Sequence, residues 1–227
     1  MSAIPDYIEP IDVHAISRPA RTFTGDFWFT RRMHDRLWFA IGDVAGKGLP
    51  AALVMAMIQE ELEHRIASCA RTSCDPTVTM ERLHAFLRPL LPRNRFATAV
   101  IGWLGDDGAM TIVNAGHCPP LIVRRDGRIA AIPSTGPVVG VLPNSQWQSA
   151  TLTLAPGEML LLYTDGVTEA TCCDDDEEFG RLGIERALHG APRGSARVVA
   201  ASILDAVRRH EGNERGDDLT LMAIMKA

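Results

Sequence analysis

The first third of the chain changes from strand-like to helical patterning. Residues 26–33 (DFWFTRRM) and 37–44 (LWFAIGDV) are rich in β-forming side chains and flank a short polar turn, which predicts a hairpin. Residues 11–17 alternate weakly and predict an earlier strand. Residues 51–71 then carry apolar side chains at helical spacing. We therefore expect a long helix there, with Pro50 in its first turn.

The rest of the chain combines helices with many short strands. Three more helices are predicted: one that starts near residue 75 and ends before Pro89 or Pro92, one over about residues 182–188, and one over 195–210. The predicted strands cover residues 96–104, 110–114, 121–125, 128–132, 148–154, 158–164 and 219–225. This order differs from the regular alternation of a doubly wound parallel fold. It indicates an α+β fold of antiparallel sheets covered by helices, in a single domain.

Composition excludes several classes of function. Lys plus Arg total 23 and Asp plus Glu total 28, for a net charge of -5. Because phosphate backbones need a basic face, nucleic-acid binding is not expected. The longest apolar run, residues 49–58, is too short to cross a bilayer. The first residues, MSAIPDYIEP, lack the pattern of a secretion signal, so we expect a cytoplasmic protein without membrane contact.

The five cysteines do not form a C-x-x-C pair. Reduced thiols are the expected state in a cytosolic protein. Four suitably spaced zinc ligands cannot be assembled from the sequence.

Acidic residues recur beside glycine at the ends of predicted strands. A carboxylate in an apolar strand is costly unless it is paired or bound to a metal. Each could instead cap a turn. Oxygen ligands suit Mg²⁺ and Mn²⁺, and two such ions can lower the pKa of a bridging water. The acidic residues beside or near glycine at strand ends are Asp26, Asp43, Asp165, Asp217 and Asp218.

Around these residues the chain resembles the PPM-type metal-dependent serine/threonine phosphatases, in the bacterial SpoIIE/RsbU-like branch. The matching pieces occur in the family's order. They are TGDFW, IGDVAGKGLPAAL, RFATAVIGWL, NAGHCPPLIV, STGPVVGV, GEMLLLYTDGVTEA, FG and GDDLTLMAI. The resemblance implies a four-layer α-β-β-α sandwich of two antiparallel sheets flanked by helices, in a single phosphatase domain over residues 1–227.

The resemblance also implies a ligand set for two Mn²⁺ or Mg²⁺ ions. Asp43 would bridge both ions, and Asp26 and the carbonyl of Val44 would complete one of them. Asp165 and Asp217 would bind the other ion. Asp218 would support these ligands or bind an additional ion. The bridging water would attack phosphoserine or phosphothreonine without a covalent phosphoenzyme.

Two departures from the family pattern leave every carboxylate in place. Thr24 stands where a glycine is common, and Ala45 stands where serine is common. Relatives often carry a sensory domain, whereas about ten residues precede the match here. A separate regulatory protein or sensor is therefore expected, unless the chain is one part of something longer. The helix after Gly48 is the family's candidate switch element.

Several nearby residues are candidates for regulation or substrate contact. The loop Gly46, Lys47 and Gly48 follows Asp43, but its spacing is not that of a Walker A motif, so Lys47 is not expected to clamp a nucleotide. His117 could line the cleft or act as an acid, or it could be packed and hydrogen-bonded. Asn114 could support the turn or contact the substrate.

Two further motifs match other chemistries, but local features argue against each of them. HCPPLIVR matches the bare H-C-x₅-R pattern of cysteine phosphatases, but its two prolines remove amide donors and its LIV reads as a strand. CCDDDEEF could bind Ca²⁺ or supply an aspartyl nucleophile, although mutual repulsion favours a solvated loop.

The resulting hypothesis is a protein serine/threonine phosphatase in a partner-switching pathway. By resemblance, its substrate would be a phosphorylated STAS-type anti-sigma-factor antagonist. The alternative is a catalytically weak or inactive regulator that uses the same fold to bind a signalling partner. A homodimer is compatible with either hypothesis.

Overall fold

The computed structural model describes residues 10–20, 22–69, 74–92, 95–172, 177–192, 194–211 and 216–227. These residues form two compact units that are interleaved along the sequence. The first unit takes in Met1–Arg21, Pro120–Ala131 and Ala155–Ala227, and the second takes in Thr22–Pro119 and Ile132–Leu154. The expectation of a single phosphatase domain over residues 1–227 stays a prediction.

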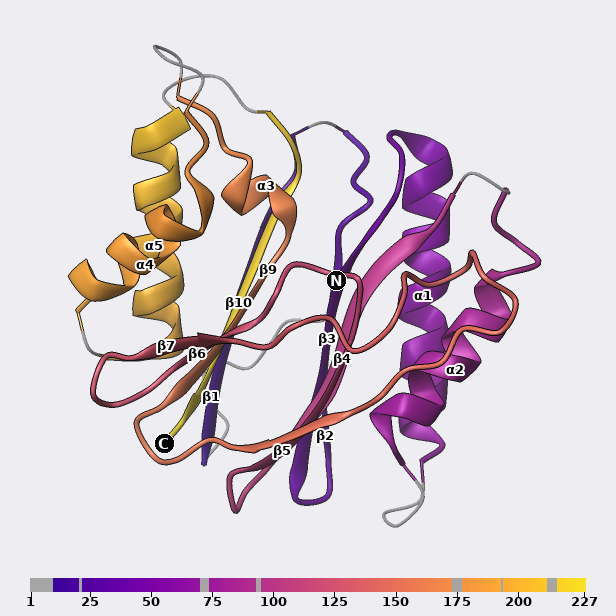
Figure 1. Cartoon of the computed structure of the whole chain (residues 1–227), viewed down its shortest axis with the longest axis horizontal. Coiled ribbons are helices and arrows are strands. Elements are labelled where there is room, and N and C mark those ends of the chain that lie inside the picture. Colours follow the sequence, from indigo (N-terminus) through magenta and orange to yellow (C-terminus); the bar gives the residue numbers. More distant parts are fainter. Residues whose placement is uncertain are drawn as a thin grey trace. The chain divides into compact units, whose positions relative to one another are not determined.

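The second unit is a five-stranded antiparallel sheet with two helices on one face (Figure 1). The sheet order is β2-β3-β4-β5-β8. Its elements are β2 (Phe27–Met33), β3 (Arg36–Val44), α1 (Leu49–Ala67), α2 (Pro76–Leu87), β4 (Ala97–Gly105), β5 (Ala109–Ala115) and β8 (Ala150–Thr153).

Alternation along the strands decides which face of this sheet each side chain occupies. Trp38 and Ala40 on β3 belong to the core cluster that also contains Ile58 and Leu62 of α1. Asp43 is out of phase with these residues, so it lies on the face away from the two helices. The sheet therefore buries one face under α1 and α2 and presents Asp43 on the other.

The first unit is also a five-stranded antiparallel sheet, in the order β1-β10-β9-β6-β7. Helix α5 packs against β1 and β10, and α4 packs against α5 (Figure 1). Its elements are β1 (Ile11–Arg18), β6 (Leu121–Val123), β7 (Ile129–Ala131), β9 (Met159–Tyr163), α3 (Asp165–Thr168), α4 (Gly180–Gly190), α5 (Ala196–Glu211) and β10 (Leu219–Lys226).

These elements confirm the α+β class with two antiparallel sheets flanked by helices. The predicted hairpin forms β2 and β3, and His34 supplies the positive φ of 56° at its turn. The second predicted helix begins at Pro76, where the Asp75 side chain accepts a hydrogen bond from the Thr77 amide at 2.6 Å. Within the described residues no helix has both the length and the apolar character needed to cross a membrane.

The structure corrects one local prediction and adds two details to the others. Helix α1 starts at Leu49 and ends at Ala67, whereas residues 51–71 were expected, and residues 70–73 lie outside the described part of the chain. The short helix α3 was not predicted, because four residues carry too little periodicity. The predicted strands 148–154 and 158–164 form β8 and β9, which belong to different sheets.

The expectation of reduced thiols is wrong for Cys69 and Cys74, which form a disulfide. Their Cα atoms are 5.6 Å apart, within the range that a disulfide spans. The bridge joins the end of α1 to the residues that precede α2. Sequence spacing alone could not show this proximity.

Candidate metal centre

Two of the predicted ligands face each other across the β2–β3 hairpin. Phe27 pairs with Gly42 in the antiparallel register, which places Asp26 across from Asp43 where the strands end. Asp26 is 5% exposed. Carboxylates directly opposite each other repel, and burial strengthens the repulsion. A positive charge between the two carboxylates would offset this repulsion.

Gly25 allows an unusually close approach of the chain to Asp43. A Cβ at Gly25 would lie 2.7 Å from Oδ1 of Asp43 and 2.8 Å from the carbonyl oxygen of Val44. The Val44 amide donates to the Gly25 carbonyl at 3.3 Å, which holds the two segments together. A carboxylate oxygen and a carbonyl oxygen thus lie on the same side of Gly25. An all-oxygen donor set of this kind fits a hard divalent cation.

The first unit brings its own acidic residues to one end of the sheet. Asp165 opens α3 directly after β9, and Asp217 and Asp218 precede β10, the strand that pairs with β9. A Cβ at Gly166 would lie 1.9 Å from the carbonyl oxygen of Asp218, so the start of α3 lies directly against this segment. Residues about fifty positions apart in the sequence are therefore neighbours here.

Asp218 and Asp217 have protein partners as well. The Asp218 side chain accepts a hydrogen bond from the Ala20 amide at 2.8 Å, and the Asp217 side chain accepts one from the Asp218 amide at 2.9 Å. The contact with Ala20 ties β1 to the start of β10. The role of Asp218 stays a prediction.

Within the described residues, no group of three or more His, Cys, Asp or Glu side chains is arranged to hold a metal ion by itself. The ligand assignments made from the resemblance therefore stay predictions. They concern Asp26, Asp43, Val44, Asp165, Asp217 and Asp218.

Thr98 is a residue of this site that sequence reasoning missed. It lies opposite Asp43 in the β3–β4 register, so the two side chains share one face of the sheet. Its Oγ1 lies 2.8 Å from Nδ1 of His117, within hydrogen-bonding distance. The only signal in the sequence was a polar residue between two alanines of a predicted strand, within the motif RFATAV.

His117 and Asn114 form a compact buried turn. His117 is 6% exposed, and Asn114 is fully buried. The Asn114 side chain accepts a hydrogen bond from the His117 amide at 2.8 Å and donates one to the His117 carbonyl at 3.2 Å. Of the two roles considered for Asn114, these bonds support the structural one. Substrate contact by either residue stays a prediction.

The loop after Asp43 is held by Arg95, which was also missed. Gly46 and Gly48 have positive φ angles of 112° and 80°. The Arg95 guanidinium donates to the Ala45 carbonyl at 2.9 Å and occupies the space that a Cβ at Gly46 would need. The Ala45 amide donates to the Phe96 carbonyl at 2.8 Å. Lys47 is exposed on this loop.

The alternative motifs lack the structure that their chemistry would require. In HCPPLIVR, residues Leu121–Val123 form strand β6 with no helix after it, and Arg124 pairs with Glu158 at 2.6 Å. A cysteine phosphatase would need a phosphate loop leading into a helix. In CCDDDEEF, residues 173–176, which include three of the five acidic residues, lie outside the described residues.

Comparison with known proteins shows which proteins the whole chain is similar to. Phosphoserine phosphatase RsbU of Bacillus subtilis is 26% identical over 220 residues, which cover 96% of this chain and 64% of RsbU. The crystal structure of the RsbU and RsbW domains of Rv1364c from Mycobacterium tuberculosis matches with a TM-score of 0.77 at 26% identity, covering 95% of this chain and 60% of that one.

The fold is shared with a PP2C phosphatase domain. The structure of that domain of SpoIIE from Bacillus subtilis, with a fragment of its regulatory domain, matches with a TM-score of 0.82 at 17% identity. The match covers 95% of this chain and 63% of that one. The chain spans between 39% and 64% of the length of three curated relatives that it matches. The family model described as stage II sporulation protein E (SpoIIE) matches residues 33–226, so the chain belongs to the SpoIIE family.

Proposed function

We propose that this chain is the catalytic part of a metal-dependent protein serine/threonine phosphatase. The observation that carries the proposal is the pair Asp26 and Asp43, which face each other across β2 and β3 beside Gly25. Membership of the SpoIIE family and similarity to the phosphoserine phosphatase RsbU support the same activity.

The proposed ligands are those that the family motifs assign. Asp26, Asp43 and the Val44 carbonyl would hold one Mn²⁺ or Mg²⁺ ion, and Asp43, Asp165 and Asp217 would hold a second. When bound, such ions lower the pKa of water and stabilise charge on a phosphoryl group. Gly25 and Gly166 leave room for the backbone to approach, and Thr98 and Arg95 hold the strand and the loop that flank Asp43.

The proposed substrate is a phosphorylated STAS-type antagonist in a partner-switching pathway in the cytoplasm. RsbU similarity and the presence of an RsbW domain beside the RsbU domain of Rv1364c support this class of pathway. We also propose that a separate regulatory protein or sensor acts on the loop Gly46–Gly48 and on α1, which follows it directly.

The activity is tested by phosphate release from a synthetic phosphoserine peptide in the presence of Mn²⁺. Wild type should release phosphate, and Asp43→Asn should lower the rate at least about 100-fold because a ligand carboxylate is lost. Asp205→Asn, the same change at an exposed position of α5, should leave the rate unchanged. Equal rates for wild type and Asp43→Asn would favour the inactive regulator instead.

A further inference from the structure

The first unit contains a hollow of about 370 Å³ beside the β6–β7 hairpin. It forms where α4 ends at Gly190 and the chain crosses to the start of α5 at Ala196. Helix α5 packs over β1 and β10, at the far side of the sheet order from β7. The hairpin edge of the sheet is therefore left with a recess between strands and helices.

The floor and walls of this hollow are apolar. Six elements of the first unit contribute a large apolar side chain each, and Met159 and Val199 are almost fully buried, at 4% and 6% exposed. The volume lies within the range of about 300–1,000 Å³ in which proteins bind small molecules. The six large apolar side chains that line the hollow are Val123, Ile129, Met159, Leu188, Val199 and Met225.

The rim of the hollow carries positive charge. Arg125 and His189 line it together with Arg124, whose guanidinium is already engaged by Glu158. The stem of Arg125 lies over Gly157, with its Cγ, Cδ and Nε atoms 3.6 Å from where a Cβ would be. In the part of the chain that the structure describes, Arg125 has no carboxylate partner.

The other rim groups leave this positive charge uncompensated. The neighbouring carboxylate, Asp126, pairs with Arg128 at 2.6 Å. His189 uses Nδ1 to contact the Glu185 carbonyl at 2.7 Å, which leaves its Nε2 for another group. An apolar recess edged by a guanidinium and an imidazole is complementary to a molecule with an apolar body and one anionic head.

We propose that this hollow binds a small amphiphile with an apolar chain and a single anionic head, such as a carboxylate. The apolar chain would displace water from the six side chains of the recess, and the head would pair with Arg125 at its rim. This site is separate from the acidic residues of the candidate metal centre, and the proposal does not depend on the phosphatase activity.

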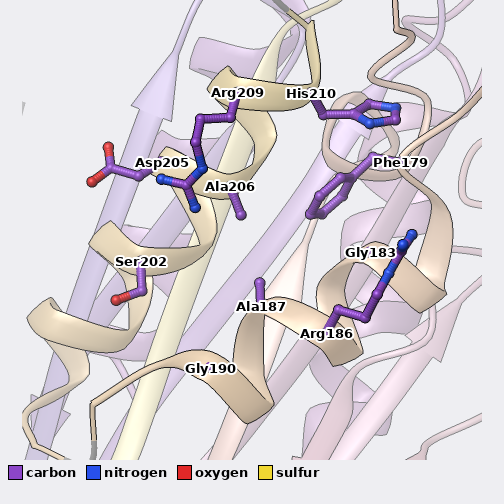
Figure 2. A pocket seen from close by; sticks show the side chains of 10 residues that line it. All are labelled: Phe179, Gly183, Arg186, Ala187, Gly190, Ser202, Asp205, Ala206, Arg209 and His210. Carbon is purple, nitrogen blue, oxygen red and sulfur yellow. The ribbon is translucent and has the colours of Figure 1, made fainter.

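A second hollow of the same unit provides a matched control. It measures about 550 Å³ and lies between α4 and α5, where Figure 2 shows Arg209 on α5 and Arg186 on α4 among the side chains that line it. Its lining also includes the carboxylate Asp205, so its charge is mixed. A change at Arg209 alters surface charge on α5 without touching the proposed site.

The test uses decanoate below its micellar concentration and protein labelled with ¹³C at its methionine methyl groups. Met159 and Met225 line the hollow, whereas Met80 and Met110 are buried in the second unit. Decanoate should shift the Met159 and Met225 signals in a saturable manner and leave Met80 and Met110 unmoved. Decanol, which lacks the charge, should bind about tenfold more weakly.

Two variants decide whether the binding uses the proposed groups. Arg125→Glu should weaken decanoate binding at least about tenfold, and Leu188→Trp should abolish it by filling the recess. Arg209→Glu should bind like wild type. Unchanged signals of Met222, which is buried in the first unit outside the hollow, show that each variant is folded there, and Met80 and Met110 report the same for the second unit.

The proposal is overturned if saturating decanoate leaves Met159 and Met225 unmoved in the folded wild type. It is equally overturned if decanol binds as well as decanoate, or if Arg209→Glu weakens binding as much as Arg125→Glu does. In those cases the recess either does not bind decanoate or binds it without a specific contribution from the charge of Arg125.

Discussion

The Oδ1 atom of Asp43 lies 2.7 Å from the position that a Cβ would occupy on Gly25. Real Cβ atoms do not tolerate this distance, and the carbonyl of Val44 is almost as close at 2.8 Å. The glycine is therefore required by the position of the carboxylate and carbonyl oxygens that are proposed to bind metal.

Gly25→Ala should displace Asp43 and Val44 and so impair metal binding. We expect Mn²⁺ affinity, measured by titration calorimetry, to fall at least about tenfold, as for other changes that disturb the position of metal ligands. Gly190→Ala is the matched control, because nothing lies within 4 Å of the added methyl group. If Gly25→Ala binds Mn²⁺ as wild type does, the close approach has no role in the site.

Thr98→Val should test the link between β4 and His117. The change keeps the β-branched shape and removes the hydroxyl that contacts Nδ1 of His117 at 2.8 Å. We expect the free energy of unfolding to fall by about 1 kcal/mol, the usual contribution of such a bond. Urea denaturation measures this difference, and Thr151→Val at an exposed position of β8 serves as the control. Equal losses from the two changes would contradict a specific role for Thr98.

His84 makes stability depend on pH. Its Nδ1 accepts a hydrogen bond from the Gly140 amide at 3.1 Å, and its ring packs against Trp147. Burial, with a smaller contribution from the charge of Arg88, lowers the pKa of His84 from its ordinary value of 6.5. Below pH 6.5 the unfolded chain therefore binds a proton at this residue more readily than the folded chain does.

The stabilisation from neutral His84 should be complete above pH 6.5 and should be lost as the pH falls below it. We expect His84→Gln, which can still accept from the Gly140 amide, to flatten this dependence between neutral and mildly acidic pH. Denaturant unfolding of both proteins at several pH values measures the effect. Parallel curves for wild type and variant would rule out His84 as the source.

The disulfide between Cys69 and Cys74 should stabilise the connection from α1 to α2 only modestly. Closing so short a loop contributes roughly 2 kcal/mol at most in the chain-entropy account. Reduction with dithiothreitol should lower the melting temperature of wild type, and the double variant Cys69→Ser, Cys74→Ser should not respond to the reductant. A response of the double variant would assign the effect to another cysteine.

Local pattern predicted most of the elements, because their side chains carry the information within a few residues. The hairpin of β2 and β3 and the start of α2 at Asp75 are examples. Pairing of distant strands was harder. Strands β8 and β9 are close in sequence but lie in different sheets, since β8 pairs with β5 and β9 pairs with β10 and β6.

In the candidate site too, some residues could be found from the local sequence and others only from the fold. The acidic residues were found because carboxylates beside glycine are conspicuous at strand ends. Thr98 and Arg95 were missed because their roles depend on which residues lie beside them in the fold. Thr98 lies opposite Asp43 in the strand register, and Arg95 lies against Gly46. The disulfide was missed for a related reason, because spacing along the chain does not give the distance between two thiols in the fold.

The central claim is that the facing carboxylates of Asp26 and Asp43 require a divalent cation. Thermal unfolding of wild type and Asp43→Asn, each with EDTA and with Mn²⁺, tests this claim directly. With EDTA, Asp43→Asn should be the more stable protein by about 0.2–1 kcal/mol, since a like-charge pair is removed.

With Mn²⁺, wild type should gain stability in proportion to its affinity for the ion and should become the more stable protein. Asp205→Asn should follow wild type in both conditions. A reversal of the stability order between EDTA and Mn²⁺ is the result that this account predicts. The same order in both conditions, with no gain of wild type from Mn²⁺, would contradict it.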